Sequence, residues 1–244
     1  MKFKHFLLTR WNLLDPATDI YNYGIDDPDA WVRRRANLFE RYCLPSVMNQ
    51  TCQDFTWLLA FSQKTPLDIT KRYRNLKNIK IIYEFPRDYL QNNYKGEWLL
   101  TSRLDNDDIY EPDCVEKIQE NVKKSIKVGS VGNRIIDIDG VQWDMRVDKW
   151  YDSGRAAPNS PFMSLFENTR KPYYSIDPKF GLIKEKIKTV LYCSHTRMVQ
   201  HFPSAKILKP LFVQCIHHEN LANKINGGDL PPNKLQYWKS KYKI

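Results

Sequence analysis

The sequence predicts an α/β protein in which a mostly parallel central sheet is flanked by helices. Short apolar and aromatic runs alternate with stretches of helical period along the first half of the chain, which is the pattern of a parallel sheet. One of these runs, residues 98–104, leads directly into a group of carboxylates. Because open α/β sheets bind ligands at the carboxyl ends of their strands, this edge of the sheet is the expected place of a site.

The first half of the chain supplies four expected strands, at residues 6–9, 55–61, 78–85 and 98–104. Between the first two, apolar positions recur at helical spacing from Ala30 to Met48, with Asp29 as the expected N-cap. Pro45 interrupts this helix, so a kink or a break is expected there. A second helix is expected at residues 67–76, which completes an alternation of strands and helices.

The second half of the chain has weaker patterns. A helix is expected at residues 113–124, and a strand at 130–138 is expected to turn at Asp139 and Gly140 into a second strand at 141–145. Residues 148–178 show no clear period and predict a long loop of the kind that is usually functional. A helix at 184–202, a strand at 211–217 and a basic, aromatic tail complete the expected elements.

Composition bounds the size of the protein and the nature of its partners. With 244 residues, 42% of them hydrophobic, the chain can bury one substantial core, so a single domain is expected. The formal net charge of +10 favours an anionic partner: a nucleotide-linked substrate, a nucleic acid or an acidic membrane surface. The five cysteines lack metal-type spacing and predict reduced, buried thiols. The sequence shows no signal peptide and no apolar span of membrane length, so a cytoplasmic location is expected.

The carboxylates after residues 98–104 carry the strongest chemical signal. Strand alternation would place Asp105 and Asp107 on one face, where charges about 5 Å apart repel by roughly 3 kcal/mol at an effective dielectric of about 20. A divalent cation would turn this repulsion into coordination, and Mg²⁺ or Mn²⁺ would keep positions open for the phosphates of a substrate. A solvated turn before a helix that starts near Pro112 is the plainer alternative. The apolar character of the preceding strand favours the metal-bridged diphosphate.

Two motifs resemble the inverting glycosyltransferases of the GT-A class. Residues 46–51, Ser-Val-Met-Asn-Gln-Thr, are similar to the helix end of that family that precedes an aromatic strand, and residues 96–108 are similar to its order Gly-Glu, strand, Asp-x-Asp-Asp. Closer similarity to the rhamnosyltransferase branch is carried by residues 8–10, 38–40, 44–47 and 101–108, with further matches at 164–167 and 194–196. The resemblance is strong over the first half of the chain and thin after about Gly140.

This resemblance implies a single GT-A (Rossmann-like) domain over residues 1–244. Residues 1–110 would bind a nucleoside diphosphate sugar through Mn²⁺ or Mg²⁺, and residues 111–244 would bind the acceptor. The implied reaction transfers a hexose, rhamnose in the nearest branch, to a hydroxyl of a glycan with inversion, as in polysaccharide biosynthesis. Acceptors of such enzymes are often lipid-linked glycans, so the basic tail at residues 234–244 is expected to contact an anionic membrane surface. A tail packed on its own domain is the alternative.

The resemblance also implies roles for individual donor-site residues. Asp107 would be the principal metal ligand, with Asp105 touching the metal through water or binding the donor ribose. His217, which follows the last strand, is a further candidate ligand, and Asp108 would orient the metal or the donor sugar. Arg10 and Arg103 could reach the diphosphate or the sugar. For Arg103, an ion pair that tethers the acidic loop is the alternative.

Two positions depart from the family pattern. Relatives carry an acid at the end of the second strand to recognise the nucleotide base, whereas this chain offers Ser62 and Gln63 there. Relatives also place the catalytic base of an inverting transfer in the second half, where a group suited to accept the proton of the acceptor hydroxyl is needed. Three candidates for that base remain open: Glu167, His195 and Asp177.

Two other classes of function stay open at this point. A non-catalytic sugar-nucleotide-binding protein would account for the missing base-recognition acid and the uncertain catalytic base. A metal-dependent nuclease or nucleic-acid binder would use the same carboxylates and the same positive charge. The basic residues are dispersed and no nucleic-acid module is visible, so a nucleic acid is not the expected partner.

Overall fold

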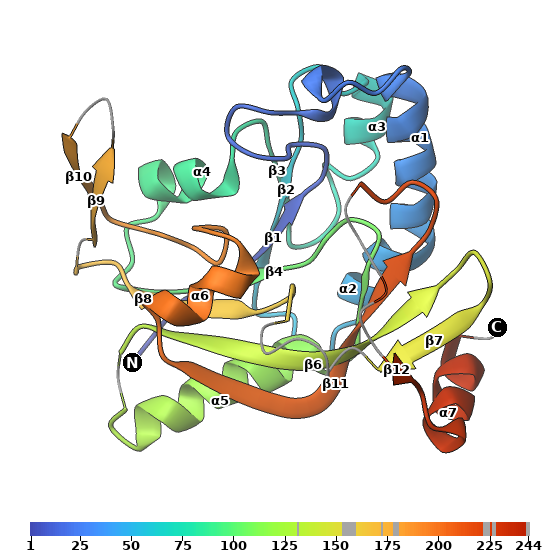
Figure 1. Ribbon diagram of the computed structural model, residues 1–244. Coiled ribbons are helices and arrows are strands. Elements are labelled where there is room, and N and C mark those ends of the chain that lie inside the picture. Colours follow the sequence, from blue (N-terminus) through green and yellow to red (C-terminus); the bar gives the residue numbers. More distant parts are fainter. Residues whose placement is uncertain are drawn as a thin grey trace.

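The computed structural model confirms the predicted α/β class (Figure 1). It describes residues 1–130, 132–152, 160–171, 173–177, 181–221, 225 and 228–242, and for residues 174–177, 181–184, 195 and 196 only the backbone. Its main sheet runs in the order β12-β7-β6-β8-β4-β1-β2-β3, and the path of β11 and β5 joins it at β6.

The N-terminal half builds the parallel part of this sheet. The four strands β1 (Lys4–Arg10), β2 (Thr56–Ala60), β3 (Ile79–Ile82) and β4 (Trp98–Arg103) pair in parallel in the order β3-β2-β1-β4. Successive residues of β1 point to opposite faces, so Leu7 enters one apolar cluster and Leu8 another. The helices α1 (Pro28–Leu38) and α4 (Pro86–Asn93) lie on opposite sides of these strands (Figure 1). The short helix α3 (Leu67–Lys71) connects β2 to β3.

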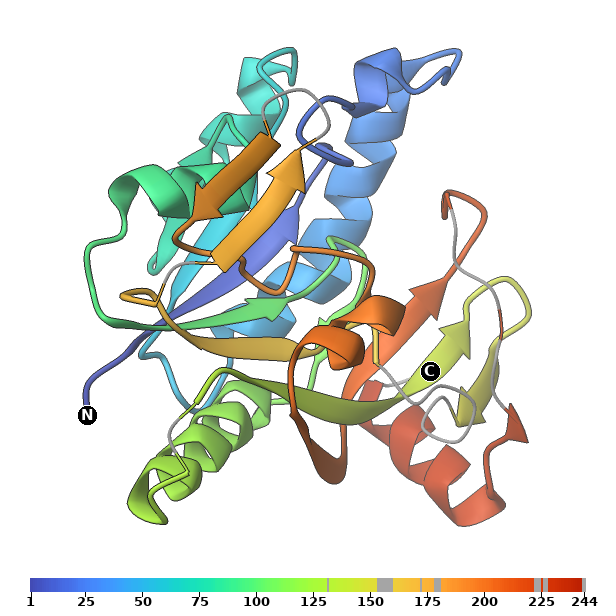
Figure 2. The ribbon, with the colours of Figure 1, turned by 60° about the vertical axis from the view of Figure 1, so that its left-hand side comes forward.

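The second half extends the sheet with mixed pairing. Antiparallel β8 (Ser164–Asn168) joins β4 to β6 (Arg134–Asp144), and β6 runs parallel to β11 (Ser204–Ile216). On the other side of β6, β7 (Lys149–Asp152) pairs with β6 and with the edge strand β12 (Gly228–Asp229), and the short β5 (Ile109–Tyr110) pairs with β11. Figures 1 and 2 place α5 (Cys114–Lys127) and α7 (Pro232–Tyr242) on the same side of the β6 and β11 pair, toward opposite ends. A separate hairpin is formed by β9 (Tyr173–Asp177) and β10 (Gly181–Glu185).

The turn predicted at Asp139 and Gly140 was wrong, because both residues lie inside the continuous strand β6. Gly140 has a packing role instead: a Cβ there would lie 2.5 Å from ring atoms of Phe212 on the neighbouring β11. The absence of a side chain therefore allows the Phe212 ring to approach the β6 backbone. In a sequence, a glycine that forms a hairpin turn cannot be told apart from a glycine that allows close packing inside a strand.

The interruption predicted at Pro45 takes the form of a π-helical segment. After α1, residues Phe39–Cys43 form this wider turn, and the α-helix α2 (Leu44–Met48) follows with Pro45 in its first turn. Proline lacks an N–H and crowds the carbonyl four residues earlier, which a π-bulge relieves. The start of α1 also differs from expectation, because its N-cap is Asp27, whose carboxylate accepts from the N–H of Ala30.

Several boundaries in the second half differ from the predicted ones. The expected helix at 184–202 shortens to α6 (His195–His201), and the strand expected at 211–217 lengthens to β11. Residues 148–178, expected to be irregular, contain β7, β8 and β9. β8 is buried at every position, so it carries no alternating pattern that the sequence could reveal.

The five cysteines are free, as expected. Within the described part of the chain, no helix has the length and apolar character needed to span a membrane.

Candidate functional site

A cleft of about 260 Å³ lies at the carboxyl ends of β1 and β4, the edge predicted to carry the site. Three guanidinium groups and two carboxylates line it, from β1, β4, α1 and the segment after β4. Asn106, Asn220 and apolar or aromatic side chains complete its wall. The lining residues, called here the cleft, are Arg10, Trp11, Leu13, Leu14, Tyr23, Trp31, Arg35, Arg103, Asp105, Asn106, Asp107, Asn220 and Leu221.

Hydrogen bonds fasten the acidic segment after β4 to the ends of its neighbours. The Leu104 carbonyl accepts from the Thr9 hydroxyl at 2.7 Å, and the Asn106 amide donates to the Trp11 carbonyl at 2.6 Å. The Tyr110 hydroxyl donates to the carbonyl of Arg103 at 2.7 Å. The carboxylates of this segment are therefore held on a fixed backbone, which is what a binding site requires.

The motif at residues 46–51 latches α2 onto the segment that follows the carboxylates. The Ser46 hydroxyl accepts from the N–H of Tyr110 at 3.2 Å. The side-chain amide of Gln50 donates to the Glu111 carbonyl at 2.7 Å, and its oxygen accepts from the N–H of Val115 at 3.0 Å. This motif thus has a positioning role, and it explains why the two motifs occur together.

Asp107 is the centre of the polar contacts in the cleft, and only 2% of its surface is exposed. Its Oδ2 lies 2.9 Å from Nη1 of Arg35, 2.9 Å from Nε2 of His217 and 2.8 Å from Nδ2 of Asn220. Its Oδ1 is buried and has no hydrogen-bond partner among the described residues. One carboxylate oxygen therefore receives three contacts while the other keeps its full capacity to accept.

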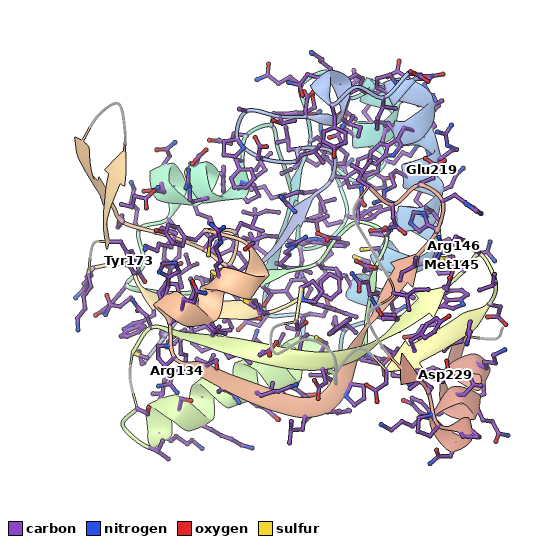
Figure 3. All side chains as sticks on the ribbon, viewed as in Figure 1. Arg134, Met145, Arg146, Tyr173, Glu219 and Asp229 are labelled. Carbon is purple, nitrogen blue, oxygen red and sulfur yellow. The ribbon has the colours of Figure 1, made fainter. Side chains whose placement is uncertain are left out.

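The turn after β11 brings His217 and Asn220 to Asp107. The Asn220 oxygen accepts from the backbone N–H of His217 at 2.5 Å, and Nδ1 of His217 accepts from the N–H of Glu219 at 3.1 Å. Because Nδ1 accepts, the proton of a neutral imidazole is on Nε2, which then donates to Asp107. Arg34 of α1 holds the same turn through Glu219, with 2.7 Å between Nε and Oε1, and Figure 3 shows Glu219 beside α1.

Asp105 forms a two-pronged ion pair with Arg103, with Nε to Oδ1 at 3.0 Å and Nη2 to Oδ2 at 2.7 Å. Burial raises the pKa of Asp105, but the charge and hydrogen bonds of Arg103, and then the charges of Arg10 and Arg35, hold that pKa below its usual value. The tether considered for Arg103 is therefore present. Arg10 donates to the carbonyl of Leu14, and its Nε is buried without a partner in the described part of the chain.

Asp108 is fully buried and is not among the residues that line the cleft. Its Oδ1 accepts from the N–H of Cys215 at 2.7 Å, so it joins the acidic segment to β11. Burial, followed by the charges of Asp107 and Asp105, raises its pKa well above the usual value. The predicted contact of Asp108 with metal or donor is absent from this arrangement, because its side chain is enclosed.

The predicted metal ligands meet only in part. His217 lies beside Asp107, but Asp105 is paired with Arg103. Among the described residues, no group of three or more His, Cys, Asp or Glu side chains is placed to hold a metal ion. The unpartnered Oδ1 of Asp107 is a feature that suits a cation. In this arrangement the donor set does not fit Mn²⁺ or Mg²⁺.

The structure does not bring Glu167 to the cleft. Glu167 lies on β8 opposite Leu99, at the far end of β4 from Asp105, and is fully buried. Its carboxylate accepts from the N–H groups of Lys188 at 3.0 Å and Thr189 at 2.9 Å. Burial raises its pKa to about 7, against the lowering effect of these bonds. Glu167 thus holds a loop and has no access to an acceptor hydroxyl.

The other predicted residues lie outside the cleft or outside the described side chains. Ser62 is buried and donates to a carboxylate oxygen of Asp19 at 2.5 Å, while the neighbouring Gln63 is exposed. An acid, Asp19 from the loop after β1, thus lies beside Ser62 near the end of β2. His195 is the first residue of α6 and Asp177 the last of β9, and the side chains of both lie outside the described part.

Two cleft residues were missed from the sequence, Arg35 and Asn220. Arg35 follows Trp31 by one helical turn, and its Cζ lies 5.1 Å from the centre of the Trp31 ring. An arginine in an amphipathic helix with several charges gives no signal of its own. Asn220 is 113 residues from Asp107 in the chain, so only the fold relates them.

Comparison with known proteins finds similarity to glycosyltransferases. Residues 27–139 match the model of the family described as "Putative rhamnosyl transferase". This match covers α1, the motif at 46–51 and the acidic segment, and it confirms the resemblance found in the sequence. No curated protein matches the chain significantly.

Solved structures of S. aureus TarS are similar to this chain over most of its length. TarS residues 1–349 in complex with UDP-GlcNAc shares 13% identity, with a TM-score of 0.45 over 92% of this chain and 62% of that one. The complex with UDP shares 12% identity, with a TM-score of 0.42 over 88% and 61%. This chain thus spans less than two thirds of the TarS chains, and TM-scores this low assign no residue and no ligand.

Proposed function

We propose that this chain transfers a sugar from a nucleoside diphosphate sugar, bound in the cleft, to a hydroxyl group of a glycan. The observation that carries this proposal is the cleft itself. It gathers Arg10, Arg35 and Arg103 around Asp105 and Asp107, at the carboxyl ends of two parallel strands. All of these residues except Arg10 lie within the segment that matches the family. Guanidinium groups suit phosphate oxygens because their planar fork donates two parallel hydrogen bonds.

The donor diphosphate is placed against the three arginines of the cleft. Arg103 and Arg10 come from the ends of neighbouring strands, and the buried Nε of Arg10 has donor capacity to spare. Asp105 is partly exposed and can accept hydrogen bonds from hydroxyl groups of the ribose or the sugar. Tyr23, half-exposed at the rim, offers an aromatic face to the base.

Transfer with inversion requires a base for the acceptor proton. Glu167 is enclosed, so the proposal does not assign this role to it. His195 and Asp177 remain the candidates, one at the start of α6 and one at the end of β9. Rhamnose as the sugar, inversion and a lipid-linked glycan acceptor remain parts of the proposal that rest on the family resemblance.

The predicted Mn²⁺ or Mg²⁺ has no step in this proposal, because the described donor set does not fit it. Contact of the tail with a membrane is likewise left as a prediction. The lysines of α7 pair with acids of their own protein: Lys234 with Asp152, Lys239 with Asp148, and Lys241 with Glu111.

The test is a thermal-shift panel of UDP, dTDP and GDP with their sugars, each with EDTA and with Mn²⁺. A ligand at about 100 times its Kd stabilises the folded state by about 2.7 kcal/mol, so one nucleotide should raise the melting temperature. The selected sugar nucleotide should then be hydrolysed slowly without acceptor, which a non-catalytic binder would not do. Arg103→Gln should abolish the shift, while the control Arg33→Gln, at an exposed ion pair on α1, should preserve it. If no nucleotide shifts the wild type under either condition, the proposed function fails.

A further inference from the structure

Arg35 stands where the predicted metal would be needed. Its Nη1 lies 2.9 Å from Oδ2 of Asp107 and 3.0 Å from Nε2 of His217, the two residues that the sequence predicts as metal ligands and that the fold brings together. Arg35 is only 7% exposed, so this is a built position and no surface contact. The guanidinium of Arg35 therefore already neutralises the charge of Asp107.

The neighbours of Arg35 hold it in place. Arg34, the preceding residue of α1, forms an ion pair with Glu219 in the turn that carries His217. The guanidinium of Arg35 itself stacks on the ring of Trp31. To bind a metal through Nε2, a neutral His217 would have to carry its proton on Nδ1. Nδ1 could then no longer accept from the backbone N–H of Glu219, so this hydrogen bond would be lost. Arg35 and His217 thus both donate to the same acceptor, Oδ2 of Asp107.

The charge of the cleft is already suited to an anion. Three guanidinium groups and two carboxylates line it, which leaves an excess of positive charge without any metal ion. The Nε of Arg35 is buried without a partner among the described residues, so its guanidinium has a donor left to offer. Phosphate oxygens are the acceptors that such a group prefers.

We propose that Arg35 is the resident cation of the donor site, which neutralises Asp107 in place of a divalent metal and binds the diphosphate of the donor. This inference rests on the proposed function and deepens it, because it states that nucleoside diphosphate binding needs no metal. Arg35 is then a specificity-determining residue for diphosphates: its fork and its fixed stacking on Trp31 cannot be reproduced by a lysine.

The test measures nucleotide affinity and metal affinity separately. Isothermal titration gives the Kd of the nucleoside diphosphate selected by the thermal-shift panel, in EDTA and in Mn²⁺, and electron paramagnetic resonance counts bound Mn²⁺ directly. The wild type should bind the nucleotide equally, within about threefold, in both media and should bind no Mn²⁺ at micromolar concentrations. In EDTA, Arg35→Met should weaken nucleotide binding about 10- to 100-fold, the size expected for lost hydrogen bonds to a charged group. Arg35→Lys should recover part of this loss, and the α1 control Arg33→Met should show none.

The outcomes separate this inference from the function on which it rests. If the wild type binds the nucleotide only with Mn²⁺, and binds Mn²⁺ itself, Arg35 is no substitute for a metal, although the donor site stands. If the wild type binds no nucleotide in either medium, the donor site and this inference both fail. Should Arg35→Met not fold, the two wild-type measurements still decide between these results.

Discussion

Two carboxylates, Asp107 and Glu167, are almost equally buried, yet the structure uses them in opposite ways. Asp107 receives three side chains from two distant segments, α1 and the turn after β11, and lies on the wall of a cleft. Glu167 receives two adjacent backbone N–H groups at the start of one loop, together with the Tyr173 hydroxyl, and it faces no cleft among those described. Burial therefore does not distinguish a site residue from a structural one.

The difference lies in the chemistry of the partners. Backbone N–H groups must be satisfied wherever they are buried, so a carboxylate that accepts them has a structural task. The partners of Asp107 are a guanidinium, an imidazole and an amide, which are groups that can also turn to a ligand. Asp107 also keeps one oxygen unpaired within the described part of the chain, while both oxygens of Glu167 accept hydrogen bonds. A carboxylate with side-chain partners and a spare oxygen in a cleft is the better candidate for function.

The largest effect is expected for Asp107→Asn. This change leaves the buried guanidinium of Arg35 without its counter-charge, and breaking a buried ion pair in this way costs about 3 kcal/mol or more of unfolding free energy. It also releases three groups of the cleft, so sugar transfer should fall by more than about 100-fold. Denaturant unfolding and initial rates measure the two effects. Asp68→Asn, at an exposed ion pair, is the matched control, and a change of at most about 1 kcal/mol is expected there. Normal transfer by Asp107→Asn would remove it from the site.

The second effect concerns Glu167 and pH. Because burial raises the pKa of Glu167 from 4.5 to about 7, the folded protein binds this proton more tightly than the unfolded chain does. The corresponding stability is complete below about pH 4.5 and is lost as pH rises to about 7, a decline of about 3 kcal/mol. In Glu167→Gln this part of the pH dependence should vanish. Unfolding free energies of both proteins, measured at several pH values, give the difference.

The same variant sharpens the comparison of the two carboxylates. The amide introduced by Glu167→Gln offers one acceptor oxygen to two N–H groups, so stability at low pH should fall by about 1 to 3 kcal/mol. Transfer per folded molecule should stay at the wild-type level, in contrast to Asp107→Asn. A loss of transfer without a loss of stability would return Glu167 to the role of catalytic base.

A third carboxylate, Glu111, is an intermediate case. It is buried, and it accepts from the side chains of Lys241 and Tyr242, both on α7. On the same helix, Trp238 stacks on Trp150 with 6.0 Å between ring centres. Glu111→Gln should lower stability by about 1 to 2 kcal/mol, and hydrogen exchange should show faster opening confined to α7. Faster exchange spread over the sheet would mean that Glu111 supports the core.

The predictable part of the fold is the part in which each element carries its own signal. The four parallel strands are apolar runs bounded by polar loops, and the acidic segment follows one of them directly. The second half lacks such signals for physical reasons. β8 is buried on both faces, and Gly140 makes room for the Phe212 ring of the neighbouring β11. Patterns of periodicity record exposure on one face and cannot record contact with a partner far along the chain.

The same limit applies to the site. Asp105 and Asp107 were found because two carboxylates after a buried strand are unusual, and His217 because it follows the last strand of the sheet. Arg35 and Asn220 are ordinary residues of a helix and a turn, and only the packing of α1 against the end of β11 gives them a role. Glu167 was a plausible base in the sequence because its burial could not be read there.

The smallest effect is expected for the charges of the C-terminal helix α7, which the sequence assigned to a membrane surface. Lys234, Lys239 and Lys241 each pair with an acid of the same protein, while Lys243 lies outside the described residues. A paired lysine gains less than the roughly 1 kcal/mol that a free basic residue gains near an anionic surface. Replacing these three lysines by Gln should therefore change sedimentation with anionic vesicles no more than replacing three exposed lysines of α5, Lys123, Lys124 and Lys127. Both triple variants should lose the same small, salt-sensitive fraction of vesicle binding, because both lose the same net positive charge. If only the α7 variant lost vesicle binding, the ion pairs of α7 would have to open at the membrane, and the tail would resume the role that the sequence predicted.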